Sequence, residues 1–449
     1  MSKAELESKH LAELHALARD AGISGYRMLP REQLVEELLV HGDAAGSEGD
    51  DGKADAGERR PRRRRRGRRG GEGRDRDRDR EKEPAAEGAD AAPEREEPEE
   101  AEGEEVTGIL DVLPQGHGFT RLSGLDPAED DVYVSASQIR RCELRPGDEV
   151  TGIAREPRRG ERHRALVRVE RVNGAEPSAD REDAFEKLTP VPPHRHIALH
   201  AEPDDVLVRA VHLLAPLAYG QRVLVRARPR SGRTTLLRGL AQAILAAPDA
   251  PGVIALLVDE RPEEVTEWRR LVPEAEIAAA AADLEPADQV RHAELAVARA
   301  RRRAEGGEDV VLLIDSLTRL GVAERDPAAI KPFFGAGREL EEEGSGSLTV
   351  IATVLSGTDD GDAAASAVET TESATVVLDA DLAAAGVVPA IDVAATGVAR
   401  EETLRDAEEL EAVRALRESL RGMAPEEAAR ALAERVRASG SNSELLASL

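Results

Sequence analysis

Apolar positions in the first 43 residues recur at the spacing of amphipathic helices. They fall into two groups, separated by the chain breaks at Gly22 and Gly25: Leu6, Leu11, Leu14, Leu17 and Ala18, then Leu34, Leu38 and Leu39. This pattern predicts a small helical N-terminal domain over residues 1–43.

Between residues 106 and 175 apolar and polar residues alternate in short runs. The runs are separated by Gly, Pro and Asp, and they read VTGILDVL, HGFTRL, DDVYVS, DEVTGIAR and RALVRVERV. Five short strands in so short a segment predict a small β-barrel of the oligonucleotide-binding (OB) type.

From residue 176 the pattern changes to apolar strands that alternate with helical stretches. The strand candidates are Arg222–Arg226, Val253–Val258, Val310–Ile314, Leu348–Val354 and Ala374–Leu378, and helical stretches such as Thr235–Leu245 and Gln289–Arg303 lie between them. This alternation predicts a mainly parallel sheet covered by helices. Amphipathic helices over 401–437 end this domain, and residues 438–449 are expected to form a flexible tail.

Residues 44–105 contain few apolar residues besides Ala and cannot form a core. An Arg-rich block over residues 59–80 is followed by a Glu-rich stretch over 81–105. Arg and Gly without apolar partners favour contact with the phosphates of RNA or DNA. The alternative is a solvated linker that its acidic neighbour partly neutralises.

The charge of the chain is an average over such blocks. Its 449 residues include 62 basic and 89 acidic residues, for a net charge of −27, and only six of the basic residues are Lys. The single cysteine, Cys142, excludes an internal disulfide. Because no apolar run reaches membrane-spanning length and no secretory signal is visible, we expect a cytoplasmic protein without a membrane partner.

The segment Val223–Thr235 has the order strand, loop, helix start, and it is similar to the phosphate-binding pattern G-x-x-x-x-G-K-[ST]. Ala227 holds the first Gly position and Gly232 the second, while Thr234 holds the position of a Mg²⁺ ligand. Arg233 replaces the Lys, and a guanidinium fork does not occupy the space of an ammonium group. A generic Gly-containing turn is the alternative interpretation.

Two carboxylates follow apolar strands that are predicted to be parallel. Asp315 ends the strand candidate at Val310–Ile314, where a Walker B residue would hold Mg²⁺ or its water, although an Asp that caps a helix is the rival interpretation. Glu260 follows Val253–Val258 at the same predicted edge, where a carboxylate can orient and deprotonate a water molecule. The alternative for Glu260 is a solvated, acidic helix start.

In the predicted barrel, Phe119, Arg121 and Tyr133 fall on neighbouring strands. Aromatic rings stack on bases and Arg contacts phosphate or stacks, so these residues favour single-stranded RNA as a ligand. The chain has only eight aromatic residues, which makes two in one barrel informative. Both could instead be core residues.

The order of these pieces and several specific strings resemble the bacterial transcription termination factor Rho family. The strings are DDVYVSASQIRR at 130–141, LVDERPEEVTEWRRL at 257–271, the segment 310–320 that contains DSLTRL, and PAID at 389–392. The resemblance implies three folded parts: the helical domain, an OB-fold (cold-shock-like) RNA-binding barrel over 106–175, and a RecA-like P-loop ATPase domain over 176–437. It further implies a homohexameric ring that binds nascent RNA, hydrolyses ATP with Mg²⁺ and acts on the RNA polymerase elongation complex.

The resemblance also assigns roles by position. Glu260 would be the catalytic base and Asp315 the Walker B residue, with Mg²⁺ at Thr234 and Asp315. Phe119, Arg121 and Tyr133 would bind RNA, together with His117 and His163 at positions where the family usually has aromatics. The positions that would bind ATP are Ala218, Tyr219, Gly220, Gln221, Arg222, Val223, Arg230, Ser231, Gly232, Arg233, Thr234, Thr235 and Arg261.

Departures from the family pattern cluster in the motor domain. Besides Arg233, Ala399 stands where an arginine finger is expected, with Arg400 one place on, and Ala380 replaces a second arginine. Asp359 or Asp360 replaces a basic residue in a loop that would face RNA, and the loop after Leu320 is shortened. The Arg-rich composition explains none of these losses of Arg.

Two functional hypotheses follow. The first is an RNA-dependent ATPase and helicase that terminates transcription, supported by Glu260, Asp315 and Thr234. The second is an ATPase-impaired, Rho-like RNA-binding paralogue with a regulatory or hetero-oligomeric role, supported by Arg233, Ala399, Ala380 and the two aspartates. We expect ATP turnover well below that of an ordinary Rho, because an arginine finger typically contributes 10³–10⁵ in rate; robust turnover would contradict the second hypothesis.

Deletion of residues 59–80 is expected to weaken RNA binding and to flatten its salt dependence. Fewer phosphate contacts mean that fewer counterions are released when RNA binds. RNA affinity measured across a series of salt concentrations tests this. An unchanged slope would identify the Arg-rich block as a linker only.

Overall fold

The protein is described by a computed structural model that covers Val35, Leu38 and residues 103–177, 185–342 and 344–449. Val35 and Leu38 are helical and buried, as expected for the second predicted helix. The rest of the predicted helical domain and the Arg-rich block lie outside the described residues. The linker predicted over 44–105 is described only from residue 103, where the first strand of the barrel is about to begin.

Five strands close into the predicted barrel, in the order β1-β2-β3-β5-β4. Their bounds are β1 Glu104–Val112, β2 Gly118–Arg121, β3 Val132–Val134, β4 Glu149–Arg155 and β5 Ala165–Val172, with helix α4 at Ala136–Arg141. Every second residue of a strand points inward, and Leu110, Val132, Val134 and Val150 are fully buried in the barrel core. Ser135 and Gln138 form a capping box at the start of α4.

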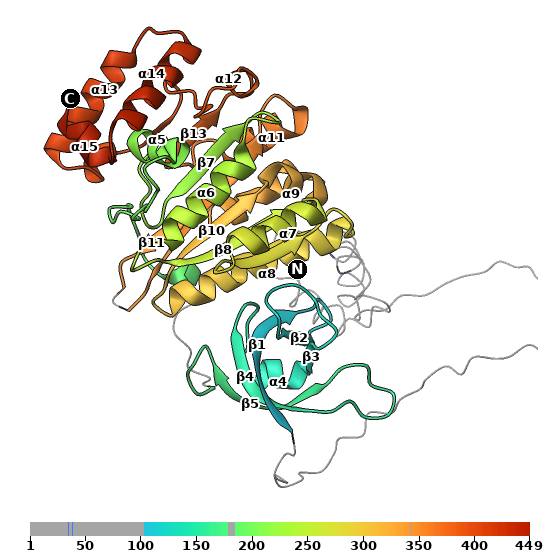
Figure 1. The fold of residues 1–449 in the computed structure, drawn as a ribbon. Coiled ribbons are helices and arrows are strands. Elements are labelled where there is room, and N and C mark those ends of the chain that lie inside the picture. The colour runs from blue at the N-terminus through green and yellow to red at the C-terminus, as the bar shows by residue number, and fades with distance from the viewer. Residues whose placement is uncertain (1–34, 36–37, 39–102, 178–184, 343) are drawn as a thin grey trace, which may run out of the picture. The chain divides into compact units, whose positions relative to one another are not determined.

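The second part is built on a nine-stranded sheet, whose main path runs β14-β13-β7-β12-β10-β8-β9 (Figure 1). Its central neighbours are all parallel, and the short strands β6, β11 and β14 pair antiparallel. The strands are β6 Pro190–Val191, β7 Arg222–Ala227, β8 Gly252–Val258, β9 Glu276–Ala280, β10 Asp309–Asp315, β11 Arg338–Leu340, β12 Ser347–Leu355, β13 Ala374–Leu378 and β14 Gly397–Val398.

Helices cover both faces of this sheet. They are α5 Val206–Leu214, α6 Arg233–Leu245, α7 Pro262–Leu271, α8 Pro286–Glu305, α9 Leu317–Glu324, α10 Lys331–Phe334, α11 Asp359–Val368, α12 Ala380–Ala384, α13 Ala407–Leu420, α14 Pro425–Ala438 and α15 Asn442–Ala447, with 3₁₀ turns at Phe185–Lys187, Pro327–Ile330 and Glu401–Thr403. Within the described ranges, none of the helices has the length and apolar character needed to cross a membrane.

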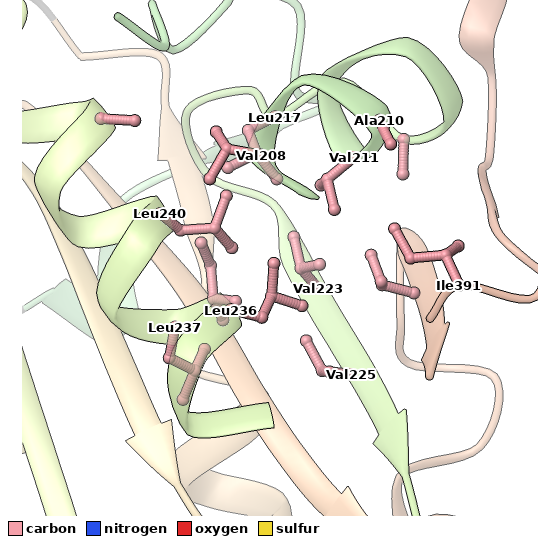
Figure 2. Close-up of a cluster of buried hydrophobic side chains, with 14 of the residues drawn as sticks. Val208, Ala210, Val211, Leu217, Val223, Val225, Leu236, Leu237, Leu240 and Ile391 are labelled. Carbon is pink, nitrogen blue, oxygen red and sulfur yellow. The ribbon is translucent and has the colours of Figure 1, made fainter. Parts of the chain in front are cut away.

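Alternate residues of the parallel strands point to opposite faces of the sheet and pack into two separate cores. In β8, Val253, Ala255 and Leu257 pack with α5, α6, α7 and the C-terminal helices, whereas Ile254 and Leu256 pack with α8, α9 and α11. Figure 2 shows the first core, in which Leu236, Leu237 and Leu240 of α6 lie against Val223 and Val225 of β7 and against α5. Burial on both faces explains why these strands read as continuous apolar runs.

The five strands predicted for the motor domain are present. The sequence pattern did not predict β9 or the short antiparallel strands β6, β11 and β14. The sequence of β9 is EIAAA, and Ala has little strand preference. Its position beside β8, to which it pairs in parallel register, comes from tertiary contacts.

The flexible tail predicted for residues 438–449 is wrong. Helix α14 extends to Ala438, and Ser441 caps a further helix, α15, by accepting from the backbone N–H of Glu444. Leu445 of α15 is 3% exposed and belongs to the core that faces α5 and α6. The apolar pair Leu445 and Leu446 was too short a signal to predict this packing.

Leu445→Ala is expected to destabilise the motor domain by about 2–5 kcal/mol, because it leaves a cavity in a packed core. Leu449→Ala, at a half-exposed position, is the matched control and should change stability little. Fluorescence of the only tryptophan, the fully buried Trp268, reports urea unfolding of this domain. Equal midpoints for the two variants would contradict the packing of α15.

Candidate nucleotide and RNA sites

The turn that the sequence predicts as phosphate-binding is a loop between β7 and α6. Strand β7 ends at Ala227 and α6 begins at Arg233, with Gly232 in the left-handed region at φ 92°. Glycine accepts this conformation without steric cost. The first turn of α6 carries no acidic residue, so its free N–H groups and helix dipole are available to an anion.

Other predicted phosphate-binding positions surround this turn. Ser231 is buried, and its hydroxyl donates to the backbone oxygen of Arg228 over 2.7 Å, which stabilises the loop. Arg230 and Thr235 are exposed to solvent beside it. Arg261 is exposed at the N-terminal boundary of α7.

The two predicted catalytic carboxylates lie at the same edge of the sheet as this loop. Asp315 ends β10 and Glu260 follows β8, and these strands are parallel neighbours. Their side chains are 0% and 7% exposed. Because the carboxyl ends of parallel strands meet in the crevice where ligands bind in open α/β sheets, the prediction of their placement is confirmed.

Arg233 contacts both carboxylates. Its Nη2 donates to Glu260 Oε1 over 2.8 Å, and its Nε lies 3.1 Å from Asp315 Oδ1. The guanidinium is itself 13% exposed. The residue that replaces the usual Lys therefore bridges the two acids.

Two further residues complete this cluster, and the sequence analysis assigned them no role. Arg319 Nη1 lies 2.6 Å from Glu260 Oε1 and also donates to the backbone oxygen of Asp259. Thr353 on β12 is fully buried and donates to Asp315 Oδ1 over 2.9 Å. Arg319 stands in the DSLTRL string, four residues after Asp315, and that spacing on the first turn of α9 was the available signal.

The candidate magnesium ligands are also adjacent. Thr234 Oγ1 donates to Asp315 Oδ2 over 3.3 Å. A hydroxyl and a carboxylate are oxygen donors that suit Mg²⁺, so the donor set fits the ion. The described residues hold no cluster of three or more His, Cys, Asp or Glu side chains that would form a protein-only metal site.

The pKa of Glu260 is raised from its ordinary value. Burial is the largest cause, and the neighbouring charge of Asp315 adds to it, while Arg319 and Arg233 oppose the rise. A carboxylate with a raised pKa is a better proton acceptor near neutral pH, as a general base requires.

A second group of predicted ATP-binding positions lies apart from this loop. Ala218, Tyr219, Gly220, Gln221, Arg222 and Val223 surround the start of β7, whereas the phosphate-binding loop follows its end. Six residues of strand span roughly 20 Å. Gln221 is buried and its amide accepts from the N–H of Ala218, and Arg222 donates to backbone oxygens of Thr371 and Gly337. Within one subunit this group supports the strand and does not reach the loop.

On the barrel, four rings form one cluster. The ring centroids of Phe119 and Tyr133 lie 5.9 Å apart, those of His117 and Tyr133 5.5 Å, and those of Phe119 and His163 5.1 Å. Tyr133 is 36% exposed. A cavity of about 660 Å³ adjoins these rings and is lined by Tyr133, His163, Arg141, Arg155 and Arg162, among others. The predicted stacking residues thus share one surface with cationic side chains.

Arg121 lies on the same face of the barrel as Phe119 and Tyr133, but its guanidinium is held in ion pairs. It is 5% exposed and its two terminal nitrogens are paired with Asp111 and Asp131. Its guanidinium lies 5.7 Å from the Phe119 ring centroid. A contact with phosphate would take the guanidinium from two buried carboxylates, which is costly, so Arg121 acts beside the ring of Phe119 on the outer face of the barrel.

Comparison with known proteins finds an RNA-binding and a nucleotide-binding domain in this chain. Residues 106–178 match the family described as Rho termination factor, RNA-binding domain, and residues 5–40 match Rho termination factor, N-terminal domain. Residues 208–331 match the ATP synthase alpha/beta family, nucleotide-binding domain. The chain is 37% identical over 369 residues to the transcription termination factor Rho of Aquifex aeolicus, and the alignment covers 77% of this chain and 84% of that protein.

The chain belongs to the Rho family of transcription termination factors. Rho of Bacillus subtilis is 38% identical over 335 residues, which are 70% of this chain and 78% of that protein. A solved ATPase from the type III secretion system of pathogenic bacteria matches 63% of this chain and 93% of its own, at 20% identity and a TM-score of 0.49. As a Rho-family member the chain combines an RNA-binding barrel with a nucleotide-binding ATPase domain.

The positions at which this chain departs from the Rho pattern are at the surface or half-buried. Ala399 and Arg400 are exposed after β14, and Ala380 begins α12. Asp359 and Asp360 are exposed in the first turn of α11. Acidic residues stabilise a helix N-terminus, so the two aspartates have a structural role in this subunit.

Tyr133→Ala is expected to weaken single-stranded RNA binding by about 1–3 kcal/mol, since one base loses its stacking partner. Tyr133→Phe keeps the ring and should retain most of the affinity. Fluorescence anisotropy with a labelled RNA measures both variants. Equal losses in the two variants would contradict stacking on this ring.

Proposed function

We propose that this chain acts as a Rho-type transcription termination factor, which binds nascent RNA on the barrel and uses RNA-dependent ATP hydrolysis to move along and release transcripts. The observation that carries the proposal is the position of Glu260 and Asp315 beside the P-loop, in a chain whose barrel presents a cluster of four rings. The family match supports the same function.

The chemistry assigned to the motor site uses residues that already lie in contact. Glu260 orients and deprotonates the water that attacks the γ-phosphate, and its raised pKa suits that task. Thr234 and Asp315 are the residues that would hold Mg²⁺, which neutralises charge on the phosphates when bound. Arg319 keeps the Glu260 carboxylate aimed from the side of α9.

The partners in this proposal are single-stranded RNA, the RNA polymerase elongation complex and further copies of the chain in a hexameric ring, in the cytoplasm. The ring is proposed because the chain belongs to the Rho family, for which the resemblance implies a homohexamer. Every copy carries Ala399 at the finger position, so a neighbouring copy brings no arginine from that position to the phosphates.

Turnover is expected to be slow in comparison with family members that carry Lys at the P-loop and Arg at the finger. Ala399 in place of the finger arginine and the contacts of Arg233 with Glu260 and Asp315 both lower the expected rate of ATP hydrolysis. The proposal therefore keeps the reaction and lowers its rate.

RNA-stimulated ATP hydrolysis by the full chain tests the function. Glu260→Gln is expected to lower turnover about 10²–10⁴-fold, since it removes the general base but keeps the shape. Glu263→Gln, at an exposed position on the first turn of α7, is the matched control and should leave turnover unchanged. Tight RNA binding without any turnover in the unmodified chain would overturn the ATP-driven part of the proposal.

A further inference from the structure

The guanidinium of Arg233 uses two different nitrogens for two different carboxylates. Nη2 binds Glu260 and Nε faces Asp315, at 2.8 and 3.1 Å. With Arg319 on Glu260, the charges of these four side chains, two positive and two negative, sum to zero, and the half-exposed Asp259 lies outside them, 3.8 Å from Arg319. A planar fork can bridge two acids in this way, whereas a Lys ammonium is a single point charge.

Every oxygen of Asp315 is engaged in this arrangement. Oδ1 accepts from Thr353 and faces Arg233, and Oδ2 accepts from Thr234. A divalent cation that approaches Thr234 and Asp315 therefore meets a carboxylate whose charge is already compensated. The carboxylate becomes available only when the guanidinium leaves.

We propose that Arg233 is a cationic latch: in the nucleotide-free subunit it occupies the two carboxylates, and it excludes a divalent cation until phosphates draw the guanidinium away. This inference rests on the proposed function, because it assumes that the loop receives a nucleoside di- or triphosphate. Arg233 is a positioning residue, since it acts on the reaction through Glu260 and Asp315.

The charges around the latch favour this order of events. When Arg233 turns to the phosphates, Glu260 and Asp315 keep only Arg319, and the side chains carry a net charge of −1. A divalent cation then enters an attractive field in place of a neutral one. Arg319 stays on Glu260 because its other contacts are independent of the P-loop: they are the backbone oxygens of Val258 and Asp259 and, at 3.8 Å, the Asp259 carboxylate.

Binding of Mn²⁺ to the full chain, followed by electron paramagnetic resonance, tests the latch without relying on turnover. Arg233→Lys keeps the charge but loses the fork, and it is expected to bind Mn²⁺ at least tenfold more tightly than the unmodified chain when no nucleotide is present. Arg233→Gln should shift Mn²⁺ affinity in the same direction.

Arg228→Gln controls for the loss of any positive charge near the loop. Arg228 is exposed and pairs with Asp381, away from the carboxylates, so its loss should change Mn²⁺ affinity little. Equal Mn²⁺ affinity in the unmodified chain and Arg233→Lys, or an equal gain in Arg228→Gln and Arg233→Gln, would overturn the latch.

A second measurement separates this inference from the proposed function. Affinity for a fluorescent ADP analogue in EDTA reports nucleotide binding without metal. If no variant binds the analogue with or without Mg²⁺, the proposed function fails and with it release of the latch by phosphates, and the Mn²⁺ comparison then decides only whether Arg233 excludes the cation. If the analogue binds and Mn²⁺ affinity does not depend on residue 233, only the latch fails.

Discussion

The motor domain depends on one constraint: two carboxylates buried at the ends of neighbouring strands need cations beside them. Glu260 and Asp315 repel each other, and an unpaired buried charge costs several kcal/mol. Arg233 and Arg319 meet this need from α6 and α9, so the P-loop helix and the helix after β10 are tied to the sheet edge by the same charges. The ends of strands β8 and β10 and the helices α6 and α9 thus all contribute a side chain to this ion cluster.

Much of the fold was predictable because each part has its own periodicity. The barrel strands alternate, and the motor strands are apolar throughout because β8 and its neighbours supply two cores. The segments that were not predicted are those whose secondary structure is determined by contacts with distant parts of the chain. The alanines of β9 become a strand beside β8, and α15 is held by Leu445 in a core formed mostly by distant residues.

For the candidate site, the sequence predicted which residues lie at the ends of neighbouring strands. Asp315 and Glu260 follow apolar strands, so their shared edge follows from topology alone. Which atoms touch was not predictable, because a replacement such as Arg233 has several possible partners until the loop is placed. The sequence could not show that Asp111 and Asp131 pair with Arg121. For Ala218–Val223, the resemblance named the positions but did not show that the length of β7 separates them from the loop.

The neutrality of the resting cluster also affects how a nucleotide is captured. A neutral, enclosed site exerts little attraction at a distance, so the first encounter falls to charges outside it. Arg230 is exposed on the loop itself, and screening by salt acts on such surface charges far more than on the buried set. The rate of nucleotide arrival should therefore follow ionic strength, while the stability of the closed cluster should be nearly indifferent to it.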